Sequence, residues 1–150
     1  MSLVQLLPQL RGLRIDAVRQ TTERILITAS PTRRTARCPA CGGRSAQIHS
    51  RYQRTLADLP ISGRPVELRV QVRRFRCRRR RCPRQIFAER LPALTAVRGR
   101  RTHGQRTALT AIGFAVGGNP GARLAQRLAL PTSRATPVSY THLRAHETGR

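Results

Sequence analysis

Four cysteines in two closely spaced pairs constrain this chain more than any other feature. Cys38 and Cys41 are separated by two residues, Cys77 and Cys82 by four, and the 150-residue chain has no other cysteine. Such spacings let two thiolates reach one ion, and zinc prefers four ligands in a tetrahedron. Pro39 to Gly43 supply a fixed backbone angle and flexible glycines, which suit a turn around the sulfurs. The pairs predict a zinc-ribbon-like β module that holds Zn2+ through all four cysteines.

Two other interpretations of the cysteines are a pair of disulfides in a secreted protein and four unrelated thiols. Residues 1–9 lack the basic start and apolar core of a signal peptide, and no stretch approaches the roughly 20 apolar residues of a membrane span. We therefore expect a cytoplasmic protein with no membrane partner, in a reducing compartment where paired cysteines usually hold metal. His49 is an alternative ligand, but four cysteines complete the site without it, and we leave it out.

The small size and aromatic-poor composition of the chain make a metal more important. Only 3% of the residues are aromatic and none is tryptophan, so one modest domain or two very small ones have little with which to fill a core. A structural zinc ion can contribute on the order of 10 kcal/mol of folding free energy, comparable to the whole stability of a small domain. We expect the central module to depend on zinc for its fold.

The positive charge of the chain is large and unevenly placed. The formal net charge is +24 and every one of the 30 basic residues is arginine, a bias that a GC-rich genome can produce. Position is more informative, because eight arginines crowd around the second cysteine pair, and so dense a patch predicts salt-dependent binding to DNA phosphates. The alternatives are a solvated arginine face and, less favoured for want of a strongly amphipathic basic helix, an anionic membrane. The predicted DNA-binding residues are Arg73, Arg74, Arg76, Arg78, Arg79, Arg80, Arg81 and Arg84.

Alternating and β-rich runs predict strands in the first half of the chain. Residues 13–18 and 24–29 are two such runs joined by a polar connection, which predicts a hairpin. Residues 66–73 alternate apolar with polar side chains, the pattern of a strand with one buried face, and they lead into the second cysteine pair. Phe75 and Phe87 flank that pair, and we expect them to pack a small core there rather than to stack on bases.

After residue 92 the pattern changes from strand to helix. Residues 102–116 carry apolar side chains at helical spacing, and residues 122–130 predict a second, shorter helix. Asn119 and Pro120 predict the N-cap and the first residue of that second helix. Two short helices joined by small residues are typical of a helix-turn-helix, although structural helical hairpins share the pattern. We therefore expect an α+β fold that ends in an incomplete helix-turn-helix.

Five short segments are more specific than composition. They are CPACG at 38–42, HSRYQRTLADLP at 49–60, RRFRC at 73–77, CP at 82–83 and IFAERLP at 86–92. In this order they resemble the amino-terminal region of bacterial insertion-sequence transposases of the ISL-three type, over about residues 10–135. The resemblance implies a zinc-binding domain on the four cysteines and a helix-turn-helix from Thr102 onward. It also implies a nucleoid-associated bacterial protein that recognises the terminal inverted repeats of its element for DNA transposition.

The same resemblance implies a catalytic domain further along, in which three carboxylates hold two divalent metal ions. The few acidic residues of this chain do not form such a group by their spacing. Asp58 is expected to serve as a helix cap or an arginine partner. We therefore expect no catalysis from this polypeptide alone. An alternative function is that of a stand-alone zinc-ribbon regulatory protein that binds DNA or RNA.

The end of the chain is interpreted differently. Residues 138–148 read as a translated sequencing-library adapter, so we expect the tail to be an assembly artefact that follows a truncated gene. His142 and His146 are therefore given no metal role, although their spacing is that of a helical zinc pair. The expected organisation is an N-terminal β hairpin at 1–30, a zinc-binding domain at 31–92, an incomplete helix-turn-helix at 93–137 and the artefact tail at 138–150.

Overall fold

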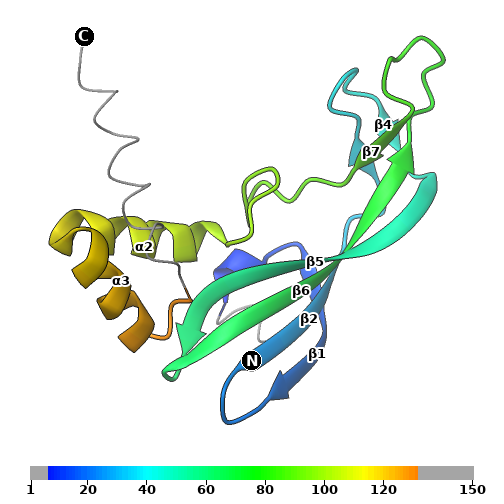
Figure 1. The fold of residues 1–150 in the computed structure, drawn as a ribbon. Coiled ribbons are helices and arrows are strands. Elements are labelled where there is room, and N and C mark those ends of the chain that lie inside the picture. The colour runs from blue at the N-terminus through cyan, green and yellow to red at the C-terminus, as the bar shows by residue number, and fades with distance from the viewer. Residues whose placement is uncertain (1–6, 132–150) are drawn as a thin grey trace, which may run out of the picture.

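The computed structural model describes residues 7–131, which form a large mixed sheet, a two-stranded sheet and two α-helices (Figure 1). Its elements are η1 (Pro8–Leu10), β1 (Leu13–Gln20), β2 (Ile25–Pro31), β3 (Ala36–Arg37), β4 (Arg44–Ser45), β5 (Ile48–Ile61), β6 (Arg64–Arg76), β7 (Ile86–Ala88), α2 (His103–Val116) and α3 (Gly118–Arg127). The large sheet has the order β1-β2-β6-β5, with β7 paired to β6, and β3 pairs with β4. The expected α+β class is confirmed.

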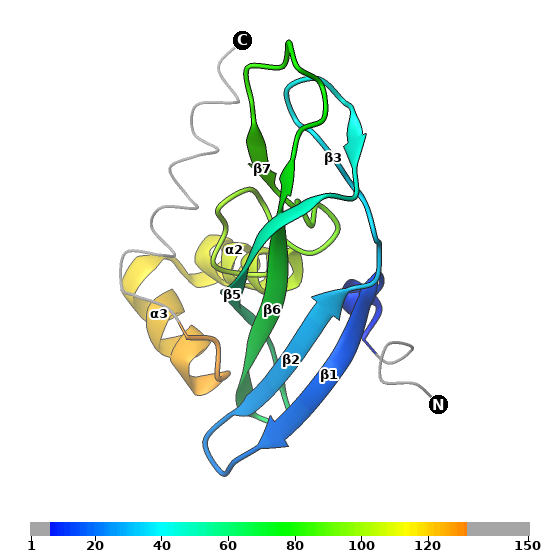
Figure 2. The same cartoon turned by 90° about the vertical axis from the view of Figure 1, so that its right-hand side faces the viewer.

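The two predicted N-terminal strands form a hairpin. β1 pairs antiparallel with β2, and β2 turns Ile25, Ile27 and Ala29 into the core. β2 also pairs in parallel with β6, so the hairpin and the long strands share one sheet (Figure 2). The domain boundaries expected near residues 30 and 92 stay predictions.

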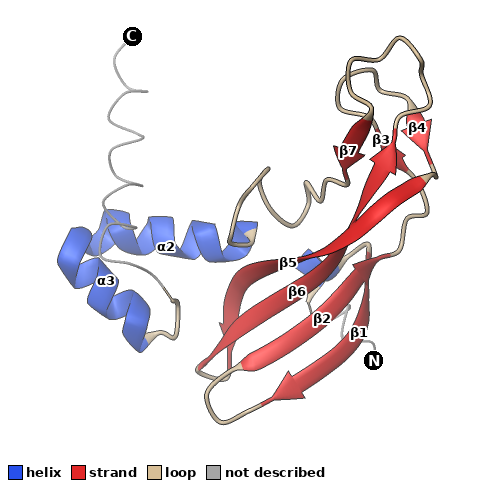
Figure 3. Ribbon diagram, turned by 45° about the vertical axis from the view of Figure 1, so that its right-hand side comes forward, coloured by secondary structure: helices blue, strands red, loops and turns tan. Residues whose placement is uncertain are grey.

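The longest strands, β5 and β6, form an antiparallel ribbon. Ser62 and Gly63 connect them, and both have positive φ angles of 50° and 71°, which the type I′ hairpin turn requires. The twisted ribbon runs from this turn past α2 to the short strands β3, β4 and β7 at its other end, whose connecting loops carry the cysteines (Figure 3). One face of β6 is almost fully buried, as the alternation predicts. The buried residues of that face are Val66, Leu68, Val70 and Val72.

α2 confirms the predicted helix over residues 102–116. Its N-cap is Thr102, whose hydroxyl accepts a hydrogen bond from the Gln105 amide at 3.3 Å. α2 and α3 share a small apolar core of Leu109, Ala125 and Leu130, separate from the core of the sheet. The helical pair therefore has its own packing and depends on other contacts for its attachment to the sheet.

The second helix begins earlier than the sequence predicts. α3 starts at Gly118, and Gly117, with φ +74°, is the one residue between the helices. Because this glycine reverses the chain within a single residue, Asn119 already lies in the first helical turn, and its predicted role as N-cap is wrong. The connection is shorter than the three or four residues that are usual in a helix-turn-helix. The helix-turn-helix therefore stays a prediction. The last residues of the expected helix-turn-helix and the tail belong to 132–150, outside the described residues.

Asp58 anchors α2 to the sheet. Its carboxylate accepts hydrogen bonds from the Thr102 hydroxyl at 2.6 Å and from the Gln9 side chain at 3.3 Å, and it is only 3% exposed. The Gln105 side chain donates to the Asp58 carbonyl oxygen at 3.2 Å. Asp58 is thus structural, but within residues 7–131 it is neither the expected helix cap nor an arginine partner, because it acts by holding the residue that caps α2.

Replacing Asp58 with alanine should loosen this attachment. The buried Thr102 hydroxyl loses its acceptor, and an unsatisfied buried polar group costs about 1–3 kcal/mol, so the free energy of unfolding should fall by that amount. Denaturant unfolding followed by circular dichroism measures the change. Asp16→Ala is the matched control, because Asp16 pairs with Arg14 at the surface, where ion pairs contribute less than about 1 kcal/mol. Equal stabilities of the two variants would contradict the anchoring role.

Candidate metal centre

The structure brings the four predicted metal ligands together at one end of the molecule. The β3–β4 hairpin carries Cys38 and Cys41, and the β6–β7 connection carries Cys77 and Cys82. The four sulfur atoms lie within 4.8 Å of one another. The Sγ atoms of Cys38 and Cys82 are 3.8 Å apart, and those of Cys41 and Cys77 are 3.6 Å apart. Each close contact joins one cysteine from each pair, so the cluster ties the two hairpins to each other.

These distances fit zinc. Four thiolates at about 2.3 Å from a tetrahedrally coordinated ion are separated from each other by about 3.8 Å. A disulfide would need sulfurs at about 2.05 Å, and all four cysteines are free. The four cysteines are therefore positioned to bind a structural zinc ion. With all four positions filled by sulfur, such an ion has no open site for a reacting water.

The first ligand loop is a tight turn. The Cys38 amide donates to the Gly43 carbonyl at 2.8 Å, and the Gly42 amide donates to the Cys38 carbonyl at 2.9 Å. Gly42 has φ +69°, in the left-handed region where glycine is unstrained. The turn therefore closes through the backbone alone, and the sulfurs of Cys38 and Cys41 remain available to the metal.

The second loop, residues 77–85, is closed at both ends. The Cys77 amide donates to the Gln85 carbonyl at 2.8 Å, and the Cys82 amide donates to the Arg79 carbonyl at 3.0 Å. The Arg84 amide also reaches the Cys82 sulfur at 3.4 Å. An amide that points at a thiolate stabilises its negative charge, so this loop supports the ligand electrostatically as well as sterically.

Phe75 and Phe87 pack behind the metal site, which confirms the expectation of core packing. Their rings stack with centroids 5.9 Å apart, and the residues are 0% and 2% exposed. Together with the buried Cys38 and Cys82 they form a core separate from that of the sheet. This core is small, which makes the bonds to zinc a large share of its stability.

The thiols differ in acidity when no metal holds them. Burial opposes ionisation of Cys38, but hydrogen bonds from backbone amides, including that of Cys41, lower its pKa to about 7. For Cys77 the Arg79 amide favours the thiolate, yet burial and the neighbouring thiols raise its pKa to about 12. The neighbouring thiols thus oppose ionisation of Cys77. Because zinc replaces these protons, its affinity rises as the pH rises.

His49 lies outside the cysteine cluster. Its side chain is exposed and its Nδ1 is 3.2 Å from the Ser50 hydroxyl. Within residues 7–131, the one group of metal-binding side chains consists of the four cysteines. The sequence-based choice of ligands is thus the set that the structure brings together.

Seven of the eight predicted DNA-binding arginines are exposed, and Arg73 is not. The Arg73 guanidinium binds both carboxylate oxygens of Glu89, at 2.9 and 2.6 Å, and also donates to the Arg33 carbonyl. Both side chains of this ion pair are largely buried. Arg73 therefore ties β6 to the segment after β7. One sign of this pair is visible in the sequence, the single acidic residue in IFAERLP, but the strand pairing was needed to find its partner.

Arg74 also differs from the others. Its guanidinium lies 4.7 Å from the centre of the Tyr52 ring, on the neighbouring strand β5. Such a cation–π contact restricts the arginine without neutralising its charge. The remaining six exposed arginines lie on the end of β6 and on the second ligand loop. They are Arg76, Arg78, Arg79, Arg80, Arg81 and Arg84, and we call them the loop arginines.

Comparison with known proteins agrees with this geometry. Residues 34–84 match the family model described as the zinc-finger of transposase IS204/IS1001/IS1096/IS1165. The match supports the resemblance of this chain to the transposase family. It contains both cysteine pairs and the loop arginines, whereas α2 and α3 lie outside it. No curated protein and no solved structure matches the chain. Neither helix in residues 7–131 is long and apolar enough to cross a membrane.

Proposed function

We propose that this chain is the DNA-binding amino-terminal part of an insertion-sequence transposase and that it recognises the terminal inverted repeats of its element. The observation that carries the proposal is the location of the loop arginines on the end of β6 and on the second ligand loop of a transposase-type zinc ribbon. The proposed organisation keeps the expected zinc-binding domain at 31–92. In this proposal α2 and α3 begin a helix-turn-helix, and strand cleavage belongs to a separate catalytic domain.

The metal would act on DNA binding indirectly. Bound zinc fixes the backbone of the second loop, where it holds Cys77 and Cys82. Arg78 to Arg81 lie between these two ligands and are all exposed. Guanidinium groups on a fixed loop lose less conformational entropy on binding phosphates than groups on a mobile loop. The zinc ribbon is then a rigid support for positive charge, and phosphate contacts set its register on the duplex.

Fluorescence anisotropy with labelled DNA duplexes tests this function. The zinc-loaded full chain is titrated with a duplex of the element's terminal repeat and with a scrambled duplex of the same composition. We expect affinity for the repeat to exceed that for the scrambled duplex by at least about tenfold. DNA-binding proteins usually bind their specific sites more than about tenfold more tightly than non-specific DNA. Equal affinities would contradict repeat recognition, and tighter binding to an RNA duplex would favour the regulatory alternative.

A further inference from the structure

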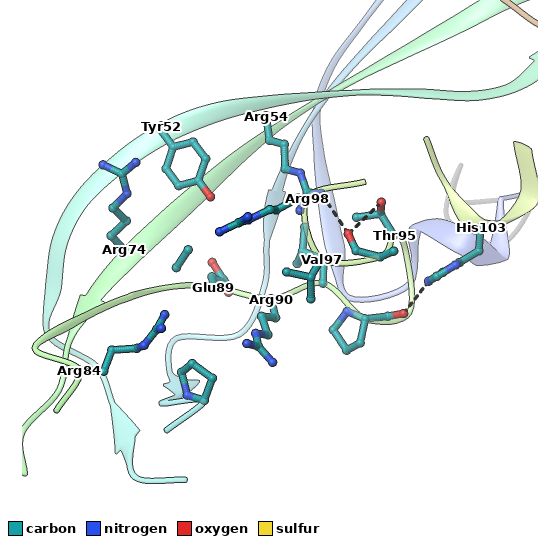
Figure 4. A pocket seen from close by; sticks show the side chains of 15 residues that line it. Tyr52, Arg54, Arg74, Arg84, Glu89, Arg90, Thr95, Val97, Arg98 and His103 are labelled. Atoms are coloured by element: carbon teal, nitrogen blue, oxygen red, sulfur yellow. Dashed lines mark hydrogen bonds between the residues drawn. The ribbon is translucent and has the colours of Figure 1, made fainter. Parts of the chain in front are cut away.

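A wide groove of about 990 Å³ lies between the zinc module and α2. Its walls come from β5 and β6, from the chain on both sides of β7, and from the segment between Leu91 and His103 (Figure 4). Most of the polar side chains that line it are basic. The charged and aromatic residues on which the argument depends are Tyr52, Arg54, Arg74, Arg84, Arg90 and Arg98.

The wall opposite β5 is a loop held in one conformation. The Arg54 guanidinium donates to the carbonyls of Ala96 and Gly99, at 3.1 and 2.6 Å, and so clamps both sides of the loop tip. The Thr95 hydroxyl donates to the Arg101 carbonyl at 2.8 Å. Between these contacts Arg98 has φ +61°, a conformation that costs a non-glycine residue free energy and that concentrates at functional sites.

These hydrogen bonds fix the position of Arg98 at the tip of the loop. Its side chain is exposed and points into the groove (Figure 4). The Arg54 guanidinium is already hydrogen-bonded to the loop carbonyls, so its role is to hold the loop. Arg98 is the residue whose charge the held loop directs into the groove.

The positive charge of the groove is not neutralised by acidic side chains that line it. Glu89 is its one acidic lining residue, and both of its carboxylate oxygens are bound by Arg73. Within residues 7–131, no ion pair joins Arg84, Arg90 or Arg98 to an acidic side chain. The groove therefore lacks internal counter-charges for three guanidinium groups, a state that favours a polyanion.

The groove is continuous with the loop arginines. Arg84 belongs to both, and Arg74 lines the groove from β6. At its other end lies His103, the first residue of α2, where the helix dipole adds partial positive charge. One basic track thus leads from the metal loop to the N-terminus of α2.

We propose that this groove holds the sugar–phosphate backbone of a DNA strand between the zinc loop and α2. The inference rests on the proposed function and adds a second contact surface to it. The width of the groove and the spread of its arginines over several elements suit successive phosphates better than one small anion. One face of the Tyr52 ring is covered by Arg74, so at most one face is left for stacking on a base. Such contacts add affinity but no sequence preference.

Salt-dependent binding of three charge-matched double variants tests the groove. The groove variant is Arg90→Gln with Arg98→Asn, since asparagine tolerates positive φ. The loop variant is Arg80→Gln with Arg81→Gln. The control is Arg14→Gln with Arg19→Gln on β1, the sheet edge opposite β5. Each zinc-loaded full chain is titrated with the repeat duplex and the scrambled duplex at several salt concentrations, after its zinc content and melting temperature are matched to the unaltered chain.

We expect the groove variant to lose about two units of salt slope, at about 0.9 per phosphate. Its affinity should fall about tenfold, equally for both duplexes, since phosphate contacts carry no sequence information. Arg98→Lys alone should keep the slope, because lysine retains the charge, whereas Arg98→Asn alone should lose about one unit.

The outcomes separate the two proposals. A groove variant that binds like the β1 control, while the loop variant loses slope, would overturn the groove and leave the DNA-binding function in place. Absence of DNA binding by the unaltered chain would overturn both. A slope lost equally in Arg98→Lys and Arg98→Asn would also overturn the groove, because the effect would then follow loop structure and not charge.

Discussion

Removal of zinc is expected to unfold the metal module. The module has a core of only two phenylalanines and two buried cysteines, and β3 and β4 are two residues long each. Zinc contributes on the order of 10 kcal/mol to folding in small domains, more than this packing can replace. A strong chelator should therefore remove the thermal transition of the module and the hydrogen-exchange protection of the Cys38, Gly42, Cys77 and Cys82 amides, which are hydrogen-bonded in the folded loops.

Cys77→Ser should have the same effect without a chelator. Serine is a poor zinc ligand, so the variant should bind much less than one zinc per chain, as measured by atomic absorption. His49→Ala is the control, because His49 is exposed and lies outside the cluster, and this variant should keep both zinc and its melting temperature. An unchanged circular dichroism spectrum and melting curve in the presence of the chelator would show that the fold does not depend on the metal.

The metal ligands were predictable from the sequence because their signal is local. A short spacing between cysteines leaves few geometries, and the glycines after Cys41 permit the turn that the structure shows. The buried face of β6 was predictable for a similar reason, since a period of two in polarity specifies which residues face the core. Even so, the sequence did not show which thiols would be closest, because that depends on how the two hairpins cross.

The groove could not be predicted from the sequence, because it depends on contacts between distant parts of the chain. Arg54 and its acceptors on Ala96 and Gly99 are more than 40 residues apart, and neither has a local pattern that predicts the pairing. Arg73 was grouped with the other arginines because it is adjacent to them in sequence. In the sheet it faces Glu89, and a count of basic residues cannot separate a buried ion pair from an exposed charge. The prediction of where α3 starts was wrong for a different reason, because Gly117 adopts a positive φ angle and makes the turn between the helices shorter than expected.

Neutralising the exposed arginines of the second ligand loop is expected to weaken DNA binding strongly and to leave zinc in place. The four residues between the ligands, Arg78 to Arg81, are replaced together by glutamine. Their side chains form no ion pair within residues 7–131, and the loop is closed by backbone groups, so the change should not disturb the metal site. If each arginine contacts one phosphate, the salt slope should fall by about 3.6, at about 0.9 per contact.

Two controls separate charge from structure in this experiment. Replacing the same four residues by lysine should keep most of the salt slope, because the charges remain, while weakening any contact that needs the planar, bidentate guanidinium. The Arg14→Gln and Arg19→Gln pair on β1 measures the effect of net charge alone. Anisotropy titrations from about 50 to 200 mM salt give the slope, a range over which phosphate-binding proteins lose several orders of magnitude in affinity. A glutamine variant with full zinc content and the slope of the β1 control would exclude these arginines from the DNA interface, and recognition would then have to come from the groove and α2.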